Sequence, residues 1–95
     1  KKINSHLLDK EDWLAFELHF RNSHSQFFEN LREKHPNLST NEIKLSAYLK
    51  LNLSSKEISS LMNVAITSIE QSRYRLRKKF NLSKEVNLAN YIQSF

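Results

Sequence analysis

The sequence predicts an all-α fold, and three observations support this prediction. Glycine is absent and Pro36 is the single proline, so the residues that form most tight β-turns are scarce. The chain also lacks runs in which β-branched and polar residues alternate, as they do in half-buried strands. Serine-based helix starts and asparagine-based helix ends recur along it. The predicted helices span residues 10–22, 25–35, 40–50, 55–62, 66–80 and 84–94.

Two hexapeptides mark helix starts with the same pattern. LSTNEI (38–43) and LSSKEI (53–58) each place a serine three residues before a glutamate, which is the spacing of a capping box. The leucine before each serine and the isoleucine after each glutamate have the spacing of a hydrophobic staple. A third start is LDKEDW (8–13), with Leu8, Asp9, Asp12 and Trp13 in the same four roles.

Three asparagines, Asn52, Asn63 and Asn81, each follow a predicted helix. After glycine, asparagine is the residue that best tolerates the left-handed backbone conformation, and many helices end on a residue in this conformation. We therefore expect asparagine to end three helices in place of glycine.

The first two helices have the pattern of a structural core. Trp13, Phe16 and Phe20 lie at i, i+3 and i+7, and Leu14 and Leu18 lie at i and i+4, which predicts one broad apolar face. The second helix continues it with Phe27, Phe28 and Leu31.

Length and composition limit the class of protein. With 95 residues and no cysteine, we expect one small core without disulfides. No apolar run approaches the roughly 20 residues that span a bilayer, and the first ten residues lack a signal peptide's apolar stretch. We expect a soluble, cytoplasmic segment that does not insert into a membrane. Because the chain begins without methionine, we also expect it to be linked to an N-terminal sensor or regulatory region.

The sequence offers no constellation for catalysis or metal binding. Neither a nucleophile–base pair nor a glycine-rich phosphate loop can be assembled from it. No histidine lies at i, i+4 from another histidine or a carboxylate, so we expect surface or packing roles for His6, His19, His24 and His35. We expect no enzymatic activity, no cofactor and no metal.

The excess of positive charge lies entirely in the second half of the chain. Residues 1–47 carry seven Lys/Arg and seven Asp/Glu, whereas residues 48–95 carry eight and three. Such an asymmetry favours a polyanionic partner.

The segment 66–80 divides into two faces when it is placed on a helix at 100° per residue. One face is apolar and consists of Ile69, Leu76 and Phe80. The opposite face carries Thr67, Gln71, Tyr74 and Lys78, with Glu70, Arg75 and Arg77 along its edges. A short capped helix, a tight turn at Asn63 and such a helix form the helix-turn-helix arrangement, whose second helix enters the DNA major groove. The sequence thus predicts double-stranded DNA as the partner.

Residues 38–92 resemble the LuxR-type (GerE-like) helix-turn-helix domain of bacterial transcription regulators. The motifs that carry the resemblance are STNE (39–42), LSSKEI (53–58) and SIEQSRYRLRKKF (68–80). The resemblance implies a four-helix DNA-binding domain over residues 37–95, preceded by a helical hairpin or linker over residues 1–36. It also implies sequence-specific binding to double-stranded DNA, with dimeric action.

The resemblance also implies roles for single residues. Base contacts fall on Glu70, Gln71 and Tyr74. Phosphate contacts fall on or near Lys56, Ser68, Arg75 and Lys78, and the exposed helical positions of Thr67 and Arg77 add them to this set. The closing helix carries an apolar face, Leu88, Tyr91, Ile92 and Phe95, for which two interpretations remain. It forms a homodimer interface, or it is buried against Ile43 and Leu76.

The chain departs from the family pattern at four positions. Asn52 replaces a glycine, and Ser72 stands where many members have histidine. Ala65 is a poor N-cap for the recognition helix. Two helix starts are therefore possible: one with Ala65 as the N-cap, and a later one in which Thr67 and Glu70 form a capping box. Arg73 lies toward the core margin, where we expect its guanidinium to pair with Glu57 or Glu42.

Two other functions remain open on the sequence alone. A region-4-like domain of a sigma factor also presents a helix-turn-helix, but acts with RNA polymerase. A helical adaptor or dimerisation module would leave the basic face solvated.

Overall fold

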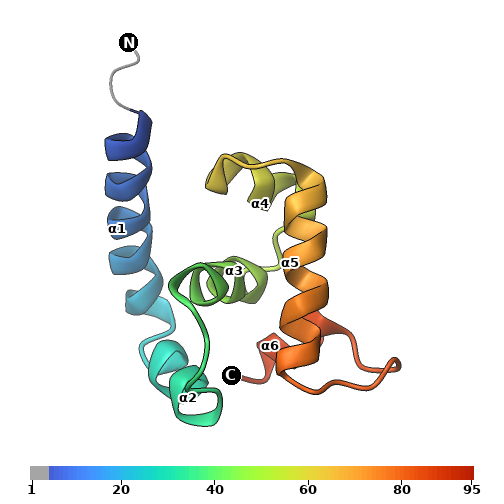
Figure 1. Ribbon diagram of the computed structural model, residues 1–95. Helices are drawn as coiled ribbons and strands as arrows, with labels where there is room; N and C mark the ends of the chain where they lie inside the picture. The colour runs from blue at the N-terminus through green and yellow to red at the C-terminus, as the bar shows by residue number, and fades with distance from the viewer. Residues whose placement is uncertain (1–4) are drawn as a thin grey trace.

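The computed structural model describes the backbone of residues 5–95 and the side chains of residues 13–95. Over this part of the chain the protein is all-helical, which confirms the predicted fold class (Figure 1). The six helices are α1 (Ser5–Ser23), α2 (Phe27–Lys34), α3 (Thr40–Lys50), α4 (Ser55–Met62), α5 (Ile66–Lys79) and α6 (Leu88–Gln93). No helix among the described residues has both the length and the apolar character needed to cross a membrane.

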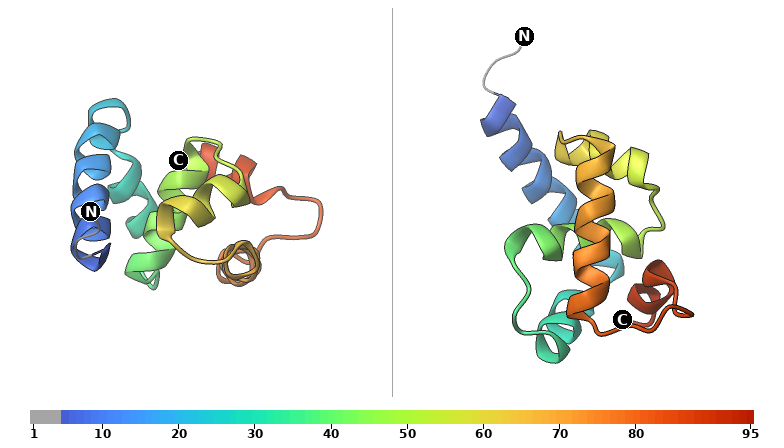
Figure 2. Two further views of the ribbon diagram at one scale, coloured as in Figure 1. Left: turned by 90° about the horizontal axis from the view of Figure 1, so that it is seen from above. Right: turned by 45° about the vertical axis from the view of Figure 1, so that its right-hand side comes forward.

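Helix α3 lies at the centre of the molecule. Figure 1 shows α1 on one side of α3 and α5 on the other, with α4 near the N-terminal end of α5. Helix α4 packs on α5, and α3 packs on both α5 and α6. The two views in Figure 2 show that the outer side of α5 is not covered by another helix. This arrangement leaves one long helical face open to a partner.

The two serine-based starts form as predicted. The Ser39 hydroxyl accepts a hydrogen bond from the Glu42 amide at 3.1 Å, and the Glu42 carboxylate accepts one from the Ser39 amide at 2.8 Å. Ser54 and Glu57 repeat both bonds at the same distances. Each box satisfies two amides that a helix start would otherwise leave without a partner. The predicted starts of α3 and α4 are therefore confirmed.

The asparagines at the helix ends adopt the predicted left-handed conformation. Their φ angles are 66° at Asn52, 59° at Asn63 and 58° at Asn81. Asparagine accepts this conformation at less cost than other side chains, so the chain turns sharply there without glycine. The turn at Asn63 is the one that positions α5 relative to α4.

The predicted bounds of α1 and α6 are wrong. Helix α1 already begins at Ser5, because SHLLD contains no helix breaker, so Asp9 is not its N-cap. The side chains of Leu8, Asp9 and Asp12 lie outside the described residues. Helix α6 begins at Leu88, four residues later than predicted, because the Asn87 side chain caps it by accepting from the Asn90 amide at 3.0 Å. Residues 82–87 consequently form a loop.

Aromatic side chains join α1 to the rest of the core. The Phe16 and Tyr48 rings lie 4.8 Å apart, and the Trp13 and Tyr48 rings lie 5.9 Å apart. Leu14 and Leu18, in contrast, are 54% and 70% exposed, so the prediction that they extend the apolar core face is wrong. At 100° per residue they project well over 90° away from the aromatic stripe, which alone faces α3.

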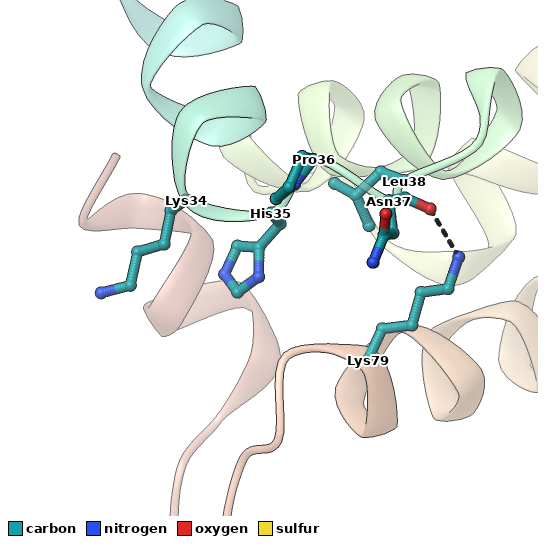
Figure 3. A pocket seen from close by; sticks show the side chains of 6 residues that line it. All are labelled: Lys34, His35, Pro36, Asn37, Leu38 and Lys79. Atoms are coloured by element: carbon teal, nitrogen blue, oxygen red, sulfur yellow. Dashed lines mark hydrogen bonds between the residues drawn. The ribbon is translucent and has the colours of Figure 1, made fainter.

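The segment between α2 and α3 is tied to the C-terminal end of α5. His35, Pro36, Asn37 and Leu38 line a pocket there together with Lys34 and Lys79 (Figure 3). The Lys79 ammonium donates to the Asn37 carbonyl at 2.9 Å and to the Glu42 carboxylate at 2.8 Å. Burial alone would raise the pKa of Glu42, but the hydrogen bonds from Lys79 and from the Ser39 amide hold it below its usual range. Lys79 thus links α5 to the start of α3.

His35 connects the same segment to α6. Its Nε2 atom lies 2.7 Å from the Tyr91 hydroxyl, and its ring centroid lies 4.3 Å from that of Phe80. Burial lowers the pKa of His35 below its ordinary value, and the neighbouring charge of Lys34 lowers it further. The folded protein therefore favours the neutral imidazole.

The depressed pKa of His35 predicts a pH dependence of stability. The unfolded chain takes up a proton near pH 6.5, before the folded chain does, so the free energy of unfolding should fall as the pH drops below about 6.5. Urea titrations at pH 5 to 8 measure this fall. His35→Phe, which cannot titrate, should flatten the pH profile, whereas His19→Gln on the exposed side of α1 is the control. An unchanged profile in His35→Phe would contradict the assignment.

Candidate nucleic-acid interface

Helix α4 and a three-residue turn position α5. Ile58 and Ile69 are both buried where the two helices pack. The Val64 amide donates to the Ser59 carbonyl at 3.0 Å, which closes the turn around the left-handed Asn63. On α5 the predicted inner residues Ile69, Leu76 and Phe80 are all buried. The inner face of α5 is therefore fixed, and its rotation decides which side chains face outward.

The outer face of α5 brings together all three predicted base-contacting residues. Thr67, Glu70, Gln71, Tyr74 and Arg75 line one open depression. Tyr74 is 59% exposed, and the Lys78 ammonium lies 5.1 Å from its ring centroid. A lysine this close to the face of a tyrosine ring is held by a cation–π contact. The outer face thus combines hydrogen-bonding side chains with the neighbouring cationic side chains of Arg75 and Lys78.

The start of α5 settles which residue caps it. Helix α5 begins at Ile66, and the N-cap residue Ala65 has an extended backbone and no side-chain hydrogen bond. A later start capped by Thr67 is therefore wrong. Glu70 is not drawn back to a capping box, and its side chain lies exposed on the outer face.

Arg77 differs from its predicted role as a phosphate contact. Its guanidinium donates to the Val86 and Ser83 carbonyls, at 2.5 and 2.7 Å, and so holds the loop of residues 82–87. These bonds orient its rigid fork toward the loop, and we correct the prediction accordingly. Arg77 instead anchors the segment that leads from α5 to α6.

Lys84 is a cation on this surface that the sequence interpretation missed. It lines a second depression beside the first, together with Tyr74, Lys78 and Leu82. The expected closing helix began at residue 84, and on that helix Lys84 would not be expected to approach α5. The signal that could have placed it is Asn87, which begins α6 and leaves Lys84 in the loop.

Arg73 does not form the predicted ion pair. The Glu42 carboxylate binds Lys79 instead, and the Glu57 carboxylate accepts from the Ser54 amide. Within residues 13–95, Arg73 forms no ion pair, and its side chain is half-buried at the edge of the core.

Two other predicted phosphate contacts lie apart from the outer face of α5. Lys56 is exposed in the first turn of α4. Ser68 is exposed, but it lines an apolar pocket with Met62, Val64 and Ile69, toward α3 and α4. The structure therefore does not group these two residues with Gln71 and Tyr74.

Most of the predicted dimer face is buried within the core of the single chain. Leu88 and Ile92 are 3% and 0% exposed, so they cannot contact a second subunit without opening the core, and the prediction is corrected for both. Tyr91 and Phe95 are half-buried, with ring centroids 5.3 Å apart. Burial raises the pKa of Tyr91, whose hydroxyl binds His35. Only these two rings of the predicted set reach the surface.

Comparison of the chain with protein-family models, with curated proteins and with solved structures finds no match.

Proposed function

We propose that this chain is a sequence-specific double-stranded DNA-binding module of a bacterial transcription regulator, with a LuxR-type arrangement in which α5 enters the major groove. The observation that carries the proposal is the outer face of α5. It presents Gln71 and Tyr74 beside the cations Arg75 and Lys78, on a helix that α4 and the turn at Asn63 hold in place. A recognition helix needs this combination of a fixed inner face and a polar, cationic outer face.

The proposal divides the outer face into two roles. Arg75 and Lys78 neutralise phosphates, and such contacts position a protein without reading the sequence. Glu70, Gln71 and Tyr74 meet base edges. The amide of Gln71 can donate and accept together, as bidentate recognition of adenine requires. Lys56 in the first turn of α4 and Lys84 in the loop after α5 add further phosphate contacts.

The proposal extends to the partners and the setting. The module acts as a homodimer on DNA, and the exposed parts of the Tyr91 and Phe95 rings contribute to the dimer interface. It is the output end of a longer regulator and works in the cytoplasm, where bacterial DNA lies. The proposal contains no catalytic step and no cofactor.

Selection of bound sequences from a random double-stranded pool tests the function. We expect enrichment of a common motif, and a palindromic motif would support the dimer. A pool that stays random after several rounds at physiological salt would contradict sequence-specific binding. It would favour the adaptor alternative, in which the basic face is only solvated.

A further inference from the structure

Large apolar side chains are exposed around the turn that leads into α5. Leu61, Val64 and Ile66 are 54%, 44% and 41% exposed, although they lie within six residues of one another. Single exposed apolar residues are common on proteins, but a group of three at one turn is not explained by chance exposure alone. The turn itself is closed by Asn63 and by backbone hydrogen bonds, so its geometry does not require them.

Only Ile66 among these three belongs to α5. Leu61 lies on α4, and Val64 lines the apolar pocket with Met62 and Ile69, toward α3. Ile66 is the first residue of α5, next to Thr67 and one helical turn before Glu70. Glu70 lies at i+4 from Ile66 and lines the depression on the outer face, so the exposed Ile66 side chain lies at the edge of that face, at its N-terminal end.

Charge is divided sharply along α5. Residues 66–72 carry Glu70 and no lysine or arginine, whereas residues 73–79 carry five. The first half therefore has no side chain that could neutralise a phosphate. Recognition helices contact base edges with their N-terminal residues, and this half has the polar and apolar groups for such contacts.

The major groove offers one apolar group, the 5-methyl group of thymine. We infer that Ile66 packs against a thymine 5-methyl group in the bound site and is a specificity-determining residue. The inference depends on the proposed function and deepens it, because it names a base and an atom that α5 recognises. Gln71 and Tyr74 would then read neighbouring positions by hydrogen bonds, one or two turns further along the helix.

Deoxyuridine tests this contact, since it differs from thymidine only by the missing methyl group. Each thymine of the selected site is replaced in turn, and affinity is measured by fluorescence anisotropy with the 95-residue chain and its Ile66→Ala variant. For the unaltered chain we expect about a fourfold loss at one thymine, the value of one buried methyl group. Ile66→Ala should bind the thymine and deoxyuridine DNAs equally, while retaining binding to the site.

The matched control is Leu61→Ala, an exposed apolar residue outside α5. It should keep the fourfold discrimination. If circular dichroism shows that Ile66→Ala loses helix, Ile66→Ser, which also lacks an apolar methyl group, replaces it in the same comparison. Discrimination that survives the loss of Ile66 would overturn the inference and assign the apolar turn to a protein partner. A selected site without thymine, or an unaltered chain indifferent to every replacement, would also overturn it. Each of these outcomes would leave the proposed sequence-specific DNA binding intact. A failure to select any motif would contradict both the proposed function and the Ile66 contact.

Discussion

Leu76→Ala should lower the free energy of unfolding by about 3 kcal/mol, within the range for a buried leucine that leaves a cavity. Leu76 is fully buried on the inner face of α5, where it shares the core with Ile69 and Phe80. Of the substitutions considered for this chain, we expect this one to have the largest effect on stability. A domain of this size typically has only 5 to 15 kcal/mol of stability in total.

Urea unfolding followed by circular dichroism measures this loss. The control is Arg75→Ala, which removes the neighbouring exposed side chain of the same helix and should change stability by less than about 0.5 kcal/mol. Equal unfolding midpoints for the two variants would contradict the inner and outer faces that the structure gives to α5.

Neutralising both outer cations should have the largest effect on DNA affinity. Each phosphate contact contributes about 0.9 to the slope of log affinity against log salt, so Arg75→Ala with Lys78→Ala should reduce the slope by about two units. The same loss should weaken binding roughly 10- to 100-fold at 0.1 M salt, equally for all DNA sequences. Anisotropy titrations at several salt concentrations measure both quantities.

A matched double variant on α2 serves as the control. Arg32→Ala with Lys34→Ala removes the same formal charge from exposed positions of another helix. We expect it to reduce the slope by much less than one unit. An equal reduction in the two double variants would mean that affinity follows net charge alone, without a defined role for α5.

The sequence was most informative where structure depends on neighbours in the chain. The capping boxes at Ser39 and Ser54 and the left-handed Asn63 involve residues at most five apart, and all of them form as predicted. Periodicity likewise placed Ile69 and Leu76 on the buried face of α5. Local chemistry was therefore sufficient to give the bounds of α3 and α4 and the rotation of α5.

The remaining features depend on contacts that spacing does not reveal. Arg77 binds carbonyls of the loop of residues 82–87, which takes the place of the first turn of the predicted closing helix. The apolar spacing of Leu88 and Ile92 fits a dimer interface and burial within the chain equally well, and α6 folds back onto α3 and buries both. The Glu42 carboxylate, which was expected to pair with Arg73, instead binds Lys79, which lies 37 residues away in the sequence.

The most direct test asks whether Gln71 on α5 recognises the base sequence of DNA. Gln71→Ala is titrated against the selected site and a scrambled duplex over a range of salt. We expect the preference for the selected site to fall by roughly 1 to 3 kcal/mol, at one or two base pairs, while the salt slope stays unchanged. If Gln71→Ala instead weakened binding to both duplexes equally and lowered the slope, α5 would not read DNA with this face, and the central claim would be wrong.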